Sequence, residues 1–327
     1  MALKDSTHRG ICEAAPTPSL RLTKGDTRVS FQAVWILLIP LFSLLSAATI
    51  TAASLDPITS KAWEQYVRFA AQRMEQRLGA GATFLWVDEV PDRLTRVRAG
   101  EIVVSQVGTQ NPIRVPSGMI HDWVGAVFIE QARLKDVLQV VGDYARYKNL
   151  YAPTVIDSKV IATGEDQDRF SMVLVNKALF LQTALDIDYE SRYVQIDERR
   201  GYSVSHTTRL QEIEEYGAPS QRALREGEGH GIVWRLASIA RYVQRDGGVY
   251  FELEAMGLSR DVSASLRWLA EPIVRRVSRA SLSTSLRQTE NAVRARVELA
   301  NRPTSTRGSV AATPRGRTES QDLHATH

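Results

Sequence analysis

The sequence predicts an α+β fold in which one curved antiparallel sheet wraps around a long C-terminal helix. Six strand-like segments follow one another between residues 154 and 258. Because only short turns separate them, they are expected to pair as an antiparallel sheet. A helical pattern then runs from about Val262 to Leu299. This helix is the only predicted element large enough to cover the face that such a sheet must bury.

A small α/β extension precedes the sheet, over residues 55–118. Residues 57–79 are predicted to be helical, because apolar side chains recur there every three or four positions. Residues 84–90 and 101–108 are predicted to be short strands, and the stretch that follows, with two prolines, is predicted to be a loop.

The main domain is predicted to span residues 119–300. It opens with a strand from Met119, followed by a helix from Leu134 and a second short helix that ends at Pro153. The six strands and the long helix complete it. The apolar stripe of that helix is assigned to Leu266, Leu269, Ile273, Val277, Leu282, Leu286, Val293 and Val297, with a kink or restart at Pro272. The Pro-, Thr-, Ser- and Arg-rich tail, 301–327, is predicted to be disordered.

Two stretches, "IHDWVGAVFI" and "LKDVLQVVGDYARYKNLYAPTVIDSKVI", resemble the opening of START-like (SRPBCC, polyketide cyclase-like) domains. Two others, "EGHGIVWRL" and "ELEAMGLSRD", resemble an uncharacterised exported bacterial branch of that superfamily. The resemblance covers about residues 119–300. It implies the helix-grip fold, with a deep cavity between sheet and helix that holds an apolar small molecule or a lipid.

The N-terminal 54 residues predict export or membrane anchoring. The run Ala33–Leu45 has the length of a signal-peptide apolar region, and small residues follow it. Counting 31–53 gives enough length to span a bilayer, and basic residues precede it. Residues 1–30 are therefore predicted to be a disordered leader and residues 31–54 a signal peptide or anchor. A buried core helix is the disfavoured alternative. The body is predicted to lie outside the cytoplasm, in the periplasm or cell envelope.

Composition excludes several classes of site. The net charge of +4 over 327 residues includes no basic stripe interleaved with aromatics, which disfavours nucleic acid. The single Cys12 precedes the apolar run, so the body has no disulfide and no Cys-based metal site. There is no HExxH or GxSxG motif. A metal site would require His121, His206 and His230 to converge. We predict no catalytic residue, metal or cofactor.

The last two strands flank the turn "RDGG". A turn at Asp246–Gly247 places Arg241 opposite Glu252, whereas a turn at Gly247–Gly248 places it opposite Glu254. In either case Arg241 shares one face with Tyr250, Glu252 and Glu254. We favour solvated ion pairs on this face. Two alternatives are a buried anchor for a ligand head group and a carboxylate pair for acid–base chemistry.

The favoured hypothesis for function is a binding module for an apolar ligand. The predicted ligand-binding residues are Trp123, Trp234, Arg241, Tyr250, Glu252, Glu254 and Trp268. The tryptophans would line the cavity, and Arg241 with Glu252 or Glu254 would orient the head group. A cyclase- or aromatase-like enzyme of the same superfamily is the second hypothesis. An envelope interaction protein, with a cavity filled by its own side chains, is the third.

Overall fold

A computed structural model describes residues 54–178 and 181–302 of the chain. The predicted leader, almost all of the apolar run and almost all of the tail lie outside these residues. Ten antiparallel strands form one sheet, whose main path is β1-β3-β10-β9-β7-β6-β5-β4. Short strands β2 and β8 pair with β3 and β7. The strands are β1 Val103–Gln106, β2 Ile113–Val115, β3 Gly118–Glu130, β4 Val155–Ala162, β5 Asp168–Ala178, β6 Leu181–Gln195, β7 Arg200–Glu214, β8 Arg222–Ala223, β9 Arg235–Arg245 and β10 Gly248–Arg260.

The helices agree with the sequence prediction in most places. They are α2 Pro57–Gln76, α3 Pro91–Arg98, α4 Leu134–Val141, α5 Tyr147–Leu150 and α6 Arg267–Asn301, with short 3₁₀ helices η1 Trp86–Glu89 and η2 Tyr144–Arg146. The six predicted strands and the long C-terminal helix are confirmed, and so is the α+β fold class. The prediction of a strand over 84–90 is wrong, because η1 lies there. Helix α3 and strand β2 were not predicted.

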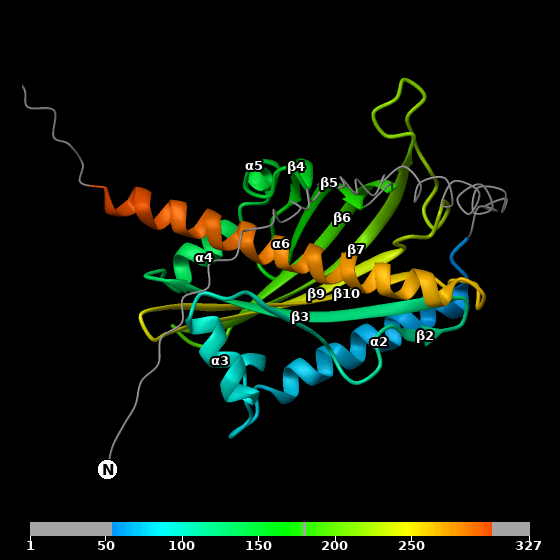
Figure 1. Cartoon of the computed structure of the whole chain (residues 1–327). Coiled ribbons are helices and arrows are strands. Elements are labelled where there is room, and N and C mark those ends of the chain that lie inside the picture. Colours follow the sequence, from blue (N-terminus) through cyan, green and yellow to red (C-terminus); the bar gives the residue numbers. More distant parts are fainter. Residues whose placement is uncertain (1–53, 179–180, 303–327) are drawn as a thin grey trace, which may run out of the picture. The chain divides into compact units, whose positions relative to one another are not determined.

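The sheet is covered on both faces, and Figure 1 shows α6 on one side of β3 with α2 and α3 on the other. One core cluster, which includes Trp123, Val127 and Phe251, packs beneath α6 through Leu282, Leu286 and Val293. A second cluster joins the opposite face to α2, η1 and α3 through Trp63, Met74, Leu85 and Val97. The expectation that only the C-terminal helix covers the sheet is therefore wrong. The N-terminal extension buries the other face.

The turn between β9 and β10 follows the first of the two predicted alternatives. Arg245 pairs with Gly248, and Arg241 lies opposite Glu252. The two turn residues, Asp246 and Gly247, both have positive φ, at 56° and 81°. This is the backbone conformation that a two-residue hairpin turn requires, and the Asp-Gly pair tolerates it well.

Helix α6 faces the sheet with the second half of the predicted stripe, and the prediction for the first half is wrong. Leu282, Leu286, Thr289 and Val293 are buried at spacings of three and four. Leu266 and Ile273, from the first half of the predicted stripe, are exposed. The gap of five residues between Val277 and Leu282 breaks the helical repeat. With 3.6 residues per turn, the two halves of the predicted stripe therefore lie on nearly opposite sides of the helix.

Among the described residues, no helix is long and apolar enough to cross a membrane.

Candidate ligand-binding site

The first half of α6 leaves an open pocket against the sheet. Extending the buried stripe of α6 backwards in steps of three and four gives Arg279, Arg275, Pro272 and Trp268. All four are exposed, and Trp268 has 75% of its surface accessible. Positions that are buried in the second half of the helix are therefore open in the first half.

The sheet shows the same change along β10. On the face beneath α6, Phe251 is buried, whereas Leu253, Ala255 and Gly257 are only half-buried. The alternate residues of β10, which face α2, η1 and α3, stay buried as far as Leu258. Cover over the α6 face is therefore weaker at Leu253, Ala255 and Gly257, although Ser259 beyond them is buried.

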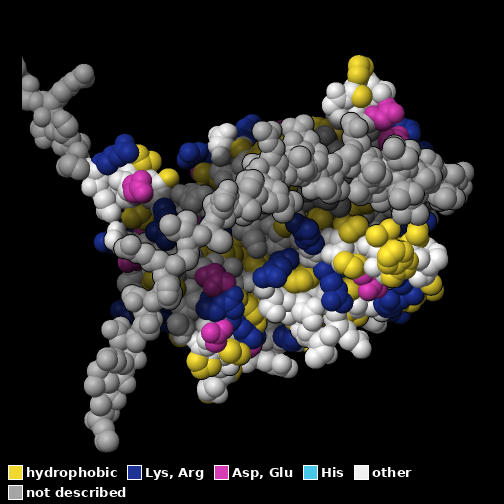
Figure 2. Space-filling model, viewed as in Figure 1, with side chains coloured by type: hydrophobic (Ala, Val, Ile, Leu, Met, Phe, Trp, Pro, Cys, Tyr) yellow, Lys and Arg dark blue, Asp and Glu magenta, His cyan; other side chains and the backbone are white. Residues whose placement is uncertain are grey.

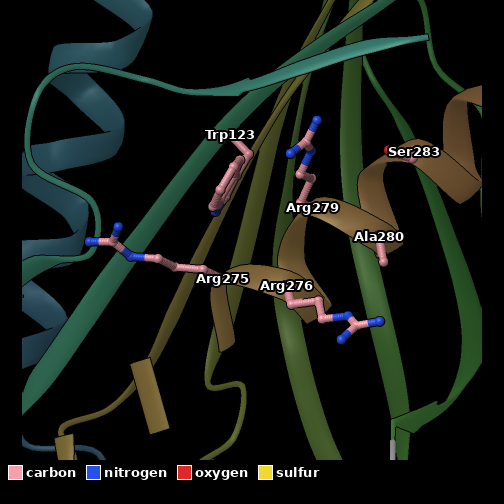
Figure 3. A pocket seen from close by; sticks show the side chains of 6 residues that line it. All are labelled: Trp123, Arg275, Arg276, Arg279, Ala280 and Ser283. Carbon is pink, nitrogen blue, oxygen red and sulfur yellow. The ribbon is translucent and has the colours of Figure 1, made fainter. Parts of the chain in front are cut away.

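The pocket has a volume of about 450 Å3 and is lined by Trp123, Arg275, Arg276, Arg279, Ala280 and Ser283. Figure 3 shows Trp123 on β3 facing α6, with the three arginine side chains spread around it. Figure 2 shows basic side chains over α6, next to hydrophobic side chains at its first turns. The lining thus combines an aromatic wall with a concentration of positive charge.

Elsewhere the space inside the curved sheet is filled by aromatic side chains. Tyr144 of η2 stacks on Phe170 at 4.2 Å between ring centroids, and Phe170 stacks on Tyr189 at 5.3 Å. Leu185, Ile187 and Leu210 complete this buried cluster. This part of the space inside the sheet is therefore packed by the protein's own side chains.

The predicted head-group residues lie on the other face of the sheet, beneath the N-terminal extension. Arg241 and Glu252 are fully buried, as is Tyr250, while Glu254 is nearly so. The favoured interpretation of a solvated face is therefore wrong for these residues. The interpretation fails because α2, η1 and α3 cover this face of the sheet, which the sequence analysis did not predict. None of these four residues lines the pocket beneath α6.

These residues belong to a buried ionic network that the sequence did not predict. Arg241 donates to Glu252 and Glu254, with nitrogen–oxygen distances of 3.2 and 2.9 Å. Arg73 of α2 bridges Glu254 and Asp122, at 2.6 and 3.2 Å. Three carboxylates therefore share two guanidinium groups, a pattern that fixes α2 against the sheet.

Two further contacts attach the extension to this network. The carboxylate of Glu252 accepts hydrogen bonds from the backbone N–H groups of Trp86 and Val87, at 2.9 and 2.8 Å. The hydroxyl of Tyr66 donates to Asp122 at 2.7 Å. Burial raises the pKa of Glu252, despite its pairing with Arg241 and these backbone donors. These contacts join α2 and η1 to the sheet, so we assign the network a structural role.

The tryptophans predicted to line a cavity separate in the structure. Trp123 forms part of the pocket, and Trp268 lies exposed on α6. Trp234 is buried in the core cluster beneath the N-terminal extension instead of facing α6. It precedes β9, which begins at Arg235, so strand alternation does not fix its direction.

A smaller pocket of about 230 Å3 lies beside the end of β7, near Glu212 and His230. Glu212 accepts a hydrogen bond from the backbone N–H of His230 at 2.8 Å and also pairs with its ring Nδ1. Gly229 has φ of +117°, and a Cβ atom there would meet the Glu212 carboxylate at 2.5 Å. This glycine therefore permits the loop to close over Glu212. In the part of the chain that the structure covers, no three His, Cys, Asp or Glu side chains are grouped to hold a metal ion.

No protein-family model matches the chain, and no curated protein matches it. Solved structures do. Human STARD10 is 10% identical and aligns over 68% of this chain and 86% of its own, with a TM-score of 0.38. A STAR-related lipid transfer protein from Xanthomonas axonopodis is 15% identical, over 60% and 98%, with a TM-score of 0.35. The Zhui aromatase/cyclase from Streptomyces sp. R1128 is 13% identical, over 56% and 98%, with a TM-score of 0.37.

These likenesses concern the arrangement of helices and strands only. The assignment of the fold rests on the chain's own topology: a first strand, short helices, a run of antiparallel strands and a long C-terminal helix across the sheet. The topology is that of a helix-grip fold, which is the arrangement that the START-like resemblance in the sequence implies.

Proposed function

We propose that this protein binds an apolar small molecule or a lipid in the pocket between the first half of α6 and the sheet. The observation that carries the proposal is the change along α6, from buried Leu282 and Leu286 to open Arg275 and Arg279. A ligand seated there would cover Trp123 and the half-buried Leu253 and Ala255. It would supply the packing that the protein itself supplies in the second half of the helix.

The size of the pocket is compatible with such a ligand. Small-molecule pockets usually have volumes of about 300–1,000 Å3, and this pocket has about 450 Å3. Each buried methylene contributes about 0.8 kcal/mol. A ten-carbon chain would supply on the order of 8 kcal/mol, before the costs of association.

The lining favours binding over acid–base catalysis. Cyclase- or aromatase-like chemistry needs a titratable acid or base at the substrate. The residues that line the pocket are Trp, Ala and Ser with three arginines, and arginine stays protonated in proteins. The perturbed carboxylates Asp122 and Glu252 lie beneath the N-terminal extension instead.

The test is native mass spectrometry of the full chain purified from its host. We expect a co-purifying apolar molecule, and we expect Ala280→Trp, which fills the pocket, to abolish it. The matched control is Ala295→Trp, an exposed alanine on the same helix outside the pocket. Equal retention of the ligand by both variants would place binding elsewhere. Absence of any ligand from the wild-type chain, together with no binding of added lipids, would refute the proposal.

We also propose that the body is exported or membrane-anchored by residues 31–54. Support comes from the apolar run between basic residues and small residues in the sequence. Protease added to cells whose outer layers have been opened should degrade the body. Protection equal to that of a cytoplasmic marker would refute this location.

A further inference from the structure

The polar groups around the pocket are nearly all hydrogen-bond donors. Arg275, Arg276 and Arg279 all line it, and their guanidinium groups point in different directions around it (Figure 3). No carboxylate is among the lining residues, and Ser283 carries the only side-chain oxygen. A neutral or cationic ligand would leave this concentration of positive charge without a partner.

The nearby acids form their ion pairs with other arginines. Glu271, on the same helix, pairs with Arg114 at 2.9 Å. Glu101 feels the charge of Arg279, but its hydrogen-bond partner is Arg96. For the described part of the chain, Arg275, Arg276 and Arg279 have no ion pair within 4.0 Å.

Trp123 supplies an independent observation. Its side chain lines the pocket, the residue is only 9% exposed, and its indole Nε1–H is buried with no acceptor among the described residues. A buried donor without a partner is destabilising. An acceptor atom of a bound ligand would satisfy this donor.

We propose that the ligand is an anionic amphiphile, whose carboxylate or phosphate head contacts Arg275, Arg276 and Arg279. This inference rests on the proposed function, and it names the chemical class of the ligand. Guanidinium groups match the oxygens of carboxylates and phosphates in pairs, which favours oxyanions over other polar groups. The apolar part lies along Trp123 and the half-buried sheet residues, and a head-group oxygen accepts from the Trp123 indole.

Four probes separate the contributions in calorimetric titrations of the full chain, with the two amphiphilic anions kept below their micelle concentrations. Decyl phosphate and decanoate carry both parts, decanol carries only the chain, and inorganic phosphate carries only the anion. We expect the two amphiphilic anions to bind at least about tenfold more tightly than decanol or inorganic phosphate, since hydrogen bonds to charged groups contribute about 1.5–3 kcal/mol.

Substitutions then locate the head group. The triple change Arg275→Gln, Arg276→Gln, Arg279→Gln should remove the preference for decyl phosphate while leaving decanol binding within about twofold. The matched control is Arg287→Gln, because Arg287 is exposed on the same helix and does not line the pocket. Trp123→Phe replaces the indole by a smaller ring without the N–H. It should weaken every probe that carries a chain, and the two anions more than decanol.

The outcomes distinguish this inference from the proposed function. Equal binding of decanol and decyl phosphate would overturn the anionic head and keep the apolar ligand. Equal binding of inorganic phosphate and decyl phosphate would show an anion site without an apolar ligand, which overturns both statements. An unchanged anion preference in the triple variant, with circular dichroism showing a folded chain, would also overturn the assignment.

Discussion

At the scale of single residues, Asp122 couples the buried network to pH. Burial and the charge of Glu254 raise the pKa of Asp122 to about 7, although Tyr66 and Arg73 oppose the shift. Its Oδ1 atom is buried and has no hydrogen-bond partner among the described residues. The folded protein therefore binds a proton at Asp122 more tightly than the unfolded chain does.

We predict that Asp122 makes the fold less stable as pH rises. Stability falls with pH wherever the folded state holds more protons than the unfolded state. For Asp122 this window runs from about 4, its ordinary pKa, to about 7. Burial lowers the pKa of His121 to about 4, and that group acts in the opposite direction.

Urea unfolding of wild type and Asp122→Asn at several pH values isolates the effect of Asp122. The wild type should lose up to about 4 kcal/mol relative to the variant between pH 4 and 7, because one pKa unit corresponds to about 1.4 kcal/mol. The His121 contribution is common to both chains and cancels in the difference. Parallel stability curves for the two chains would contradict the prediction.

Arg241 is predicted to support stability rather than ligand affinity. Removing one partner of a buried ion pair leaves an uncompensated charge and costs about 3–5 kcal/mol. Arg241→Ala would leave Glu252 without its guanidinium partner and Glu254 with Arg73 alone. Chemical denaturation should show the loss. The part of the variant that stays folded should bind decyl phosphate as the wild type does, and a selective loss of binding would restore Arg241 as a ligand anchor.

The sequence identified Trp123 as a cavity candidate but missed the arginines beside it. The missing step was the helical register of α6. Once Leu282 and Leu286 are taken as the buried stripe, steps of four and three backwards reach Arg279 and Arg275. Basic residues at positions expected to be buried would have indicated an open site. Which half of the predicted stripe faces the sheet could not be decided from the sequence without the packing of the second half.

At the scale of elements, local patterns predicted the long strands and long helices, missed α3 and β2, and failed for η1. The stretch "FLWVDEV" has the composition of a short strand. Its 3₁₀ turn is held from outside, because Glu252 on β10 accepts from the backbone N–H groups of Trp86 and Val87. A contact between residues about 165 positions apart does not appear in a local pattern.

This dependence leads to a prediction for hydrogen exchange. Glu252→Gln leaves one side-chain oxygen where two accepted, so one of the two N–H groups loses its partner. The amides of Trp86 and Val87 should exchange at least about tenfold faster in the variant. Amides of the β9–β10 hairpin serve as the internal reference. Equal acceleration there would indicate general destabilisation rather than release of η1.

At the scale of the whole molecule, the sheet packs against α6 on one face and against the N-terminal extension on the other. Strand β3 is buried at twelve consecutive positions, from Gly118 to Ile129. A strand with one solvated face alternates between apolar and polar residues, whereas a strand covered on both faces is nearly continuously apolar. The run "MIHDWVGAVFI" already lacks strict alternation. The element that covers the second face of β3 could not be predicted. The helical pattern of residues 57–79 shows an apolar face but does not show which surface it packs against.

The last prediction is that residues 119–302 do not fold without the N-terminal extension. Removing residues 54–118 would expose the face that carries Ile120, Val124 and Phe128 of β3, together with Met256 and Leu258 of β10. Each large apolar side chain contributes about 1.5–3 kcal/mol when buried. Five of them amount to on the order of 10 kcal/mol, which is comparable to the whole stability of a typical domain, about 5–15 kcal/mol. The loss of α2 also removes Arg73, so Asp122 and Glu254 lose a buried partner.

The truncated chain should show poor amide dispersion by NMR and no cooperative urea transition, beside the full chain as the control. A dispersed spectrum with one cooperative transition would show instead that the sheet and α6 form an independent domain.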